Sequence, residues 1–292
     1  LQKHLYSLEN QPNAIPYITS YYKKHWGFCI KHKERIKLKE GLYHAFIDSE
    51  VKPGVLNYGE LFIKSTENQK KEILLSTYIC HPSMANNELS GPVVTTKLAK
   101  WLNNKTKRFY NYRIIFIPET IGSIAYISLN LNNMKRNIYA GFNISCVGDD
   151  RSYSYLPSRA GDTISDKIAL HVLKWTDKNF IKYTWQDRGS DERQYCAPGV
   201  DLPIASIMRT KYGEYPEYHT SLDCLKHVVT RKGLNGGYNV LKKALDILEI
   251  NFNPIITVLC EPHLSKRDLY PTLSTKHSGT TVRTLMNYLT LA

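Results

Sequence analysis

The sequence predicts an α/β protein with a mainly parallel, mixed sheet that is covered by helices on both faces. Two observations support this prediction. From residue 72 onwards, short apolar runs rich in β-forming residues alternate with longer segments that have the spacing of amphipathic helices. Repeated strand–helix units of this kind build a parallel sheet that is buried on both faces. The hydrophobic content is 42% over 292 residues, which is ordinary for a globular protein.

Four strand–helix units follow one another along the chain. The predicted strands are apolar runs, at residues 72–80, 113–117, 139–147 and 202–208. The predicted helices span residues 91–104, 163–175 and 231–250, and a further one follows Glu119 and runs through Ile124 to about residue 131. In the first helix, Val94, Leu98 and Leu102 repeat at four-residue steps and so form one apolar face. Sheets of this class place their chemistry at the carboxyl ends of the strands.

The segment before this alternation has a different character. Residues 1–64 mix aromatic residues with short strand-like runs at 41–48 and 59–63, which is typical of a small β-rich domain. We therefore expect residues 1–64 to belong to such a domain and residues 65–254 to form the α/β domain.

The segment after the alternation is expected to begin a third part of the chain. Residues 255–292 are expected to hold a linker and the start of a further domain, with helical spacing over residues 281–291. Because the chain opens on Leu1 and not on methionine, we expect a fragment or a processed product.

Charge and cysteine usage exclude some functional classes. The net charge is +13, from 39 Lys and Arg against 26 Asp and Glu, but the lysines are scattered, so nucleic acid is not an expected partner. No apolar run reaches the ~18 residues of a membrane-spanning helix. The six cysteines form no CxxC pair, which argues against a finger-type zinc site. They lie far apart, and disulfide frameworks belong mostly to small secreted domains, so reduced thiols in a cytoplasmic protein are expected.

Polar side chains gather at the ends of the predicted strands and in two later loops. Those able to bind a metal or move a proton are His81, Glu119, Asp149 and Asp150 at three strand ends, and Asp191, Glu192, His219 and Asp223 in the loops. Each of these residues also has a purely structural explanation. A histidine at a strand end often only forms hydrogen bonds that stabilise the fold, and a glutamate can cap the next helix. Their convergence favours a zinc site, since imidazole and carboxylate are the ligands that zinc prefers. Glu119 is then well placed as a general base.

Five longer motifs resemble one known family. They are HPSMANNELSG, IFIPETIGSIAY, CVGDD, GSDERQYCAPGVDLP and KYGEYPEYHTSLD. Together they resemble the aminopeptidase-like proteins encoded in bacterial surface-polysaccharide gene clusters, which are similar to zinc exopeptidases of the leucyl-aminopeptidase and glutaminyl-cyclase type. The resemblance runs from about Leu5 to Leu285. It implies a zinc-exopeptidase-like α/β core with a small β-rich inserted domain and a terminal winged-helix-like domain.

The resemblance also implies roles for individual residues. His81 and His219 match the histidine ligands, and Glu119 matches the general base. Thr120 stands where the peptidases have a second glutamate, which implies one zinc ion and not two. The aspartate at the next strand end corresponds to Asp149 or, in an alternative alignment, to Ser145.

One position departs from the family pattern. Asn87 stands where the relatives have a metal-bridging aspartate, and an amide oxygen binds zinc more weakly than a carboxylate does. Three outcomes are open: Glu88 replaces the missing carboxylate, Asp149 completes the site, or the protein is an inactive member.

The predicted function is zinc-dependent hydrolysis of an amide bond in a small peptide or amino sugar. Zinc is expected at His81, His219 and either Asn87 or Asp149. The acidic residues expected to surround the metal or contact the substrate are Glu88, Asp150, Asp191, Glu192 and Asp223. The alternative is a catalytically inactive binding or scaffold protein that keeps the peptidase fold and acts in polysaccharide biosynthesis.

Overall fold

A computed structural model of the chain describes residues 1–20, 23–81, 83–252, 255, 257, 259–271 and 279–291. The chain divides into two compact units, Leu1–Glu249 and Ile250–Ala292. The second unit contains η4 (Leu264–Arg267) and α7 (Thr280–Leu291), so the helix predicted at residues 281–291 is present. The first unit contains the sheet and the candidate site.

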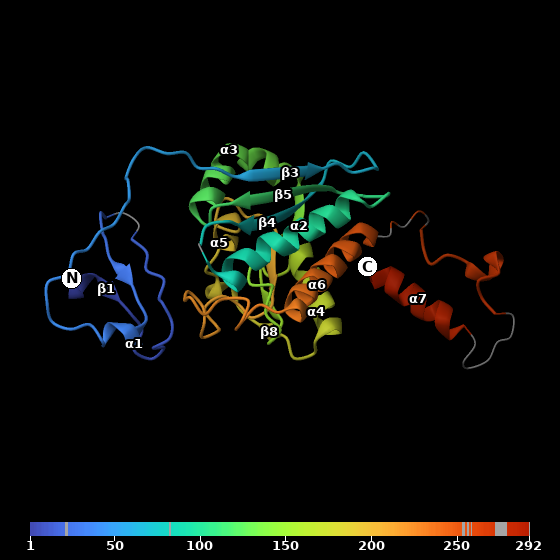
Figure 1. Ribbon diagram of the computed structural model, residues 1–292. Coiled ribbons are helices and arrows are strands. Elements are labelled where there is room, and N and C mark those ends of the chain that lie inside the picture. Colours follow the sequence, from blue (N-terminus) through green and yellow to red (C-terminus); the bar gives the residue numbers. More distant parts are fainter. Residues whose placement is uncertain are drawn as a thin grey trace. The chain divides into compact units, whose positions relative to one another are not determined.

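The sheet of the first unit has seven strands, and the predicted mixed, mainly parallel arrangement is confirmed (Figure 1). In spatial order the strands are β3 (Gly59–Ile63), β5 (Asn111–Ile117), β4 (Glu72–Tyr78), β6 (Ile138–Asn143), β9 (Ile204–Met208), β7 (Ser154–Leu156) and β8 (Ile181–Lys182). Strands β5, β4, β6 and β9 run parallel. The edge strand β3 is antiparallel to β5, and β7 is antiparallel to β9. The four parallel strands therefore end at one edge of the sheet.

Helices cover both faces of this sheet, as predicted. One face packs against α2 (Ser90–Asn103), α4 (Ile164–Thr176) and α6 (Arg231–Ile250), and the other against α3 (Ile121–Asn137) and the short α5 (Glu192–Tyr195). Alternate residues of β4 serve the two faces: Ile73 and Leu75 contact the first group, and Leu74 contacts the second. Gly91 lets α2 begin close to the sheet, because a Cβ atom there would lie 2.5 Å from the carbonyl oxygen of Ile144.

Two elements end more than two residues away from their predicted ends. Strand β6 ends at Asn143, although the apolar run continues to residue 147, because the chain turns at Cys146, whose φ is +49°. Helix α3 continues past its predicted end near residue 131, since Tyr126, Ile127 and Met134 bury one face against the sheet and extend the helix through polar residues.

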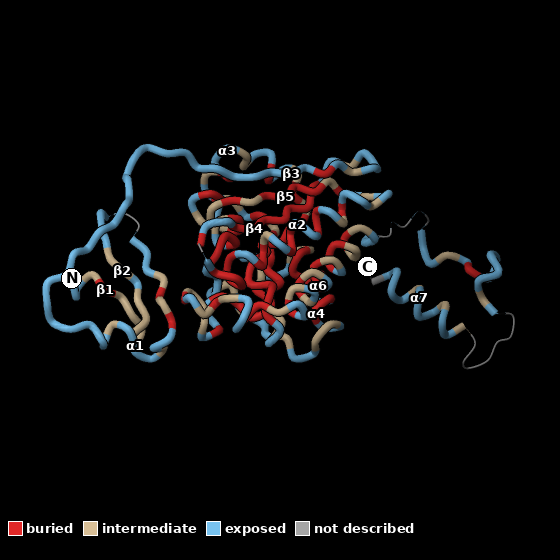
Figure 2. The backbone as a smooth tube through the Cα atoms, viewed as in Figure 1, coloured by how far each residue is buried: buried red, intermediate tan, exposed pale blue. Residues whose placement is uncertain are grey.

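The predicted strands of residues 1–64 are only partly present. The strand at residues 59–63 forms as β3, but it pairs with β5 in the large sheet because β5 offers a free edge. Residues 41–48 form no strand and, like all of residues 36–62, are exposed (Figure 2). The other elements of this segment are short: η1 (Gln2–His4), β1 (Leu5–Tyr6), β2 (Phe28–Cys29) and α1 (His32–Arg35).

No helix in the part of the chain that the structure describes is both long enough and apolar enough to cross a membrane.

Candidate active site

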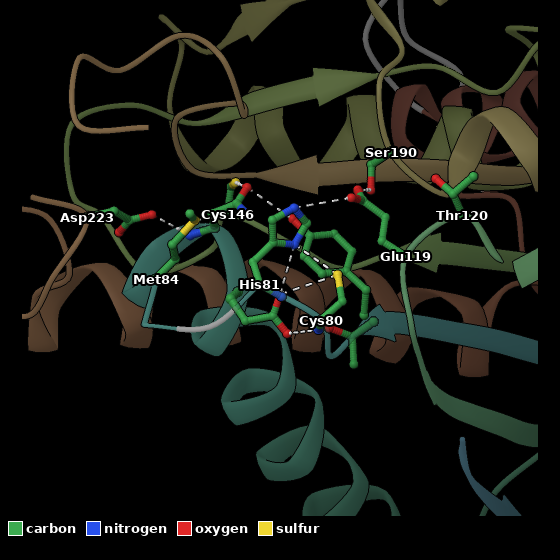
Figure 3. A network of polar contacts seen from close by, with 12 residues as sticks. Cys80, His81, Met84, Glu119, Thr120, Cys146, Ser190 and Asp223 are labelled. Atoms are coloured by element: carbon green, nitrogen blue, oxygen red, sulfur yellow. Dashed lines mark hydrogen bonds and ion pairs between the residues drawn. The ribbon is translucent and has the colours of Figure 1, made fainter. Parts of the chain in front are cut away.

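The carboxyl ends of two neighbouring parallel strands bring His81 and Glu119 together. His81 follows β4 and Glu119 follows β5, and these strands are paired along their whole length. The Nε2 atom of His81 lies 3.7 Å from Oε2 of Glu119, and the two side chains are 8% and 21% exposed (Figure 3). The pairing of the strands therefore places an imidazole beside a carboxylate in a largely buried position.

Glu88 holds the histidine from the opposite side. It lies on a π-helical turn, η2 (Ala85–Leu89), and accepts hydrogen bonds from the backbone N–H groups of Cys80, at 2.6 Å, and His81, at 2.8 Å. Its Oε2 atom lies 3.3 Å from Nδ1 of His81. A carboxylate at Nδ1 keeps the proton there and leaves the lone pair of Nε2 available to the site. Burial lowers the pKa of His81, but the hydrogen bond with Glu88 and the charge of Glu119 outweigh it, so the pKa is raised.

His219 provides a second imidazole that faces the first. The two rings lie 5.1 Å apart, and His219 stacks on Tyr218 with 3.8 Å between ring centroids. Burial, and then the nearby charge of His81, lower the pKa of His219 to about 4, so its ring is neutral at pH 7. The Nε2 atom of His219 is buried and has no hydrogen-bond partner among the described residues. A buried polar atom without a partner costs free energy, which a bound ion would recover.

The N-terminal segment closes this side of the site. Pro16 and Thr220 form an antiparallel bridge, and the N–H group of Tyr17 donates to the carbonyl oxygen of His219 at 3.0 Å. The Tyr17 ring lies 5.4 Å from the ring of His81 and 5.2 Å from that of His219. His219 has φ of +55°, an uncommon conformation for a non-glycine residue, and this bridge stabilises it.

Replacing Tyr17 with alanine is expected to lower the free energy of unfolding by about 2 kcal/mol, because two ring contacts and the packing around them are lost. Tyr17→Phe keeps the ring contacts and is expected to lose at most about 1 kcal/mol. Urea unfolding of the purified variants measures both values. Tyr43→Ala, at an exposed tyrosine of the same segment, is the matched control and should stay within about 0.5 kcal/mol of wild type. A Tyr17→Ala variant as stable as this control would contradict the structural role.

Ser190 fixes the orientation of the Glu119 carboxylate. The Ser190 hydroxyl donates to Oε1 of Glu119 at 2.8 Å, which leaves Oε2 on the side of His81. Burial raises the pKa of Glu119, although the Ser190 hydrogen bond and the charge of His81 oppose the shift. A carboxylate with a raised pKa is a better proton acceptor.

Asp191 and Glu192 support the loops around Glu119. Asp191 accepts hydrogen bonds from the Thr120 N–H group and the Ser123 hydroxyl, both at 2.7 Å, and burial raises its pKa to about 7. Glu192 accepts from the Ser190 N–H group at 2.9 Å and from other donors on Gly189, Asn143 and Tyr212. These carboxylates hold the site's backbone in place.

Thr120 does not offer a ligand to the site. Its φ is +63°, which is strained for a β-branched residue, and its hydroxyl accepts a hydrogen bond from Arg193 at 2.8 Å. The position of the peptidases' second glutamate therefore supplies neither a carboxylate nor a free hydroxyl group.

The carboxylate of Asp149 is engaged in hydrogen bonds within the fold. Its carboxylate accepts four hydrogen bonds: from the Thr210 N–H group at 2.9 Å, the Thr210 hydroxyl at 2.6 Å, the Arg151 N–H group at 3.0 Å and the Asn86 amide at 3.2 Å. The neighbouring Asp150 is exposed, and Ser145, the alternative to Asp149, is buried. Among the described residues, Asp149, Asp150 and His219 do not join the ligand cluster that contains His81, although the ring of His219 lies 5.1 Å from that of His81.

Asn87 lies on the π-helical turn, and Asp223 binds the backbone of that turn. Asp223 accepts hydrogen bonds from the N–H groups of Asn86 at 2.7 Å and Asn87 at 2.9 Å, so it holds the turn and not a histidine. Asn87 is 2% exposed, and its amide oxygen accepts a hydrogen bond from Tyr78 at 3.3 Å.

Cys80 is a donor that the sequence analysis did not select. In the described residues, Cys80, His81 and Glu119 offer ligand atoms that lie within 4.8 Å of one another. The strand predicted at residues 72–80 includes Cys80, but β4 ends at Tyr78, and Cys80 is exposed with its sulfur 2.9 Å from Nδ1 of His81. Although the residue as a whole is exposed, its thiol group is partly buried, which raises the pKa of Cys80 to about 12, so the thiol stays protonated at pH 7. In the sequence, only its position next to a strand-end histidine indicates that Cys80 could belong to the site.

Comparison with solved structures places the fold among the aminopeptidase-like α/β proteins. A zinc aminopeptidase from Bacillus subtilis superimposes with a TM-score of 0.56 at 16% identity, covering 68% of this chain and 51% of that chain. The glutaminyl cyclase of Porphyromonas gingivalis gives a TM-score of 0.51 at 14% identity, covering 66% of this chain and 84% of that chain. These similarities establish the class of fold.

The chain belongs to the family described as a domain of unknown function, DUF4910, which matches residues 13–251. It is 40% identical over 275 residues to a polysaccharide biosynthesis protein with an aminopeptidase-like domain from Clostridium acetobutylicum. The match covers 92% of this chain and 61% of that relative. The crystal structure of a peptidase from the same organism gives a TM-score of 0.83 at 39% identity, covering 91% of this chain and 62% of that chain. The family resemblance inferred from the motifs is confirmed.

Proposed function

We propose that this chain hydrolyses an amide bond with the help of one zinc ion, in the manner of an aminopeptidase acting on a small peptide or an aminoacylated or acylated amino sugar. The observation that carries the proposal is the buried Nε2 atom of His219, which has no partner among the described residues and belongs to a ring that faces His81. The aminopeptidase-like fold and the family's connection with polysaccharide biosynthesis are consistent with it.

The side chains fit one zinc ion. His81 is held at Nδ1 by Glu88, which leaves Nε2 as a donor, and His219 is neutral. Asn87 would be the third and weakest donor. Within the part of the chain that the structure describes, its amide oxygen accepts only long hydrogen bonds, from Tyr78 at 3.3 Å and from the Cys146 thiol at 3.9 Å, whereas Asp149 accepts four hydrogen bonds. A second ion lacks carboxylate ligands at Thr120 and Asn87. When bound, zinc would lower the pKa of a water molecule and polarise the substrate carbonyl group.

Glu119 carries out the proton transfers. Ser190 holds Oε1 of the carboxylate, so Oε2 accepts the proton of the attacking water. Burial favours the neutral acid that results, and the acid then donates this proton to the leaving amine. Asp191 fixes the backbone of Thr120, next to the base, and so positions the carboxylate.

A non-catalytic binding or scaffold protein is the second candidate. One observation favours it: the hydroxyl of Thr120 is bonded to Arg193 and the buried side chain at position 87 is an amide, so two positions that carry carboxylates in the peptidases do not. Metal analysis separates the two candidates.

After incubation with zinc and removal of excess metal, the purified chain is expected to contain about one zinc ion per molecule. His219→Ala is expected to weaken binding by more than about 100-fold, because a direct ligand is lost. Asn87→Asp should tighten binding by at least about tenfold, since it restores a negative charge. Elemental analysis gives the stoichiometry, and competition with a chromophoric chelator gives the affinities. His44→Ala, at an exposed histidine, is the control and should match wild type.

A wild-type chain that takes up no stoichiometric zinc under these conditions would rule out the hydrolase and leave the scaffold protein. Zinc binding that is insensitive to His219→Ala would place the ion elsewhere.

A further inference from the structure

A cavity lies at the opposite edge of the sheet from β3. It occupies about 740 Å³ beside the C-terminal half of α4 and the edge strand β8. Three strands, β6, β9 and β7, separate β8 from β4, at whose end His81 lies. The polar and aromatic residues that line the cavity are His171, Lys174, Trp175, Lys178, Phe180 and Lys182. The active site described above uses none of them.

Among the residues that the structure describes, three lysines and no acidic residue line the cavity. None of the three lysines, Lys174, Lys178 and Lys182, forms an ion pair with a carboxylate in the described ranges. The acidic residue of the connecting turn, Asp177, accepts a hydrogen bond from the N–H group of Asn179 at 2.9 Å. Three like charges around one concave surface repel one another and attract an anion.

The cavity also presents aromatic surface to solvent. Trp175 is 74% exposed, although tryptophan is highly buried on average. Phe180 lies nearby, with the Nζ atom of Lys182 5.3 Å from its ring centroid. An exposed indole face between lysines suits a ligand that has flat apolar faces as well as negative groups.

The surroundings favour spaced carboxylates over a compact phosphate. The cavity lies at the C-terminal end of α4, so the N-terminal N–H groups of this helix are not available to bind a compact phosphate, and the lysines must supply the attraction. No arginine and no glycine lines it among the described residues, and those are the groups that clamp or cradle phosphate. Lys174 lies on the helix, Lys178 on the turn and Lys182 on the strand, so the charges are spread over three elements.

We propose that this lysine–tryptophan cavity binds a segment of an acidic polysaccharide, with sugar rings stacked on Trp175 and carboxylates paired with the three lysines. The ligand chemistry follows from the charge, the exposed indole and the spacing of the lysines. The site is separate from the amide hydrolysis proposed above and does not depend on it.

Calorimetric titration of the purified chain with an oligogalacturonate, at low and physiological salt, tests the proposal. The acidic oligosaccharide is expected to bind, and a neutral maltooligosaccharide of the same length is not. Trp175→Ala and Lys178→Glu are each expected to weaken binding by roughly tenfold or more. Lys167→Glu makes the same charge change at an exposed lysine of α4 that does not line the cavity, and it should alter binding less than about twofold.

Three results would overturn the proposal. The oligogalacturonate does not bind at either salt concentration, Lys167→Glu weakens binding as much as Lys178→Glu does, or the neutral sugar binds equally well. Duplex DNA that binds with the same dependence on Trp175 would assign the cavity to nucleic acid instead.

Discussion

Replacing Glu119 with glutamine is expected to reduce amide hydrolysis by about 10³-fold, while the variant still folds and still binds zinc. Glutamine has nearly the same shape, and its Oε1 atom can accept the same hydrogen bond from Ser190. It cannot take a proton, so the water and the leaving amine both lose their proton carrier. The variant therefore separates the chemistry of the carboxylate from its contribution to the site's structure.

Initial rates on a panel of aminoacyl amides, short peptides and N-acylated amino sugars measure the effect. Zinc content and urea unfolding of the same preparation show whether the site and the fold are intact. Glu67→Gln, at an exposed glutamate, is the matched control and should keep the wild-type rate. A Glu119→Gln variant with an unchanged rate would exclude Glu119 as the base. A zinc-loaded wild type that cleaves nothing in the panel would favour the scaffold protein.

Replacing Asp149 with asparagine is expected to lower the free energy of unfolding by about 3 kcal/mol and to leave the zinc stoichiometry unchanged. The Asp149 carboxylate accepts four hydrogen bonds, from Thr210, Arg151 and Asn86, and is 1% exposed. An asparagine would direct an NH₂ donor at one or more of these donors and leave them buried without an acceptor. The loss is large because hydrogen bonds to a charged group are stronger than those to a neutral one.

The neighbouring residue offers a close control. Asp150→Asn makes the same chemical change at an exposed position, and its free energy of unfolding should stay within about 0.5 kcal/mol of wild type. Chemical unfolding followed by fluorescence measures both variants, and elemental analysis gives the zinc content. If Asp149→Asn loses zinc but keeps its stability, Asp149 is a metal ligand and its hydrogen bonds do not stabilise the fold.

Local sequence patterns predicted most of the sheet and its helices. The four parallel strands and the helices that follow them were recognisable because an apolar run and a 3.6-residue period are properties of neighbouring residues. The same locality identified His81 and Glu119, each of which follows a buried strand. Helix α3 was predicted too short because its C-terminal half is stabilised by contacts with the sheet and not by its own polar sequence.

Long-range contacts decided the roles of several residues. Asp149 and Asp223 were candidates for the metal site, but donors from distant segments occupy their carboxylates, and the sequence has no local sign of those donors. Ser190 and Tyr17 were not recognised as site residues, because the residues that they contact, Glu119 and His81, are far away in the sequence. The register of a single bridge, Pro16 with Thr220, places Tyr17 against the histidines.

The amino-acid sequence alone predicted the α/β class and the family, which are confirmed, and it named the two histidines and their glutamate as candidate site residues, because these depend on periodicity and on motifs of adjacent residues. Only the tertiary structure showed which carboxylates are free to act and which are held by the fold. The physical reason is that a side chain's chemistry depends on its hydrogen-bond partners and its burial, and both are supplied by segments far away in the chain.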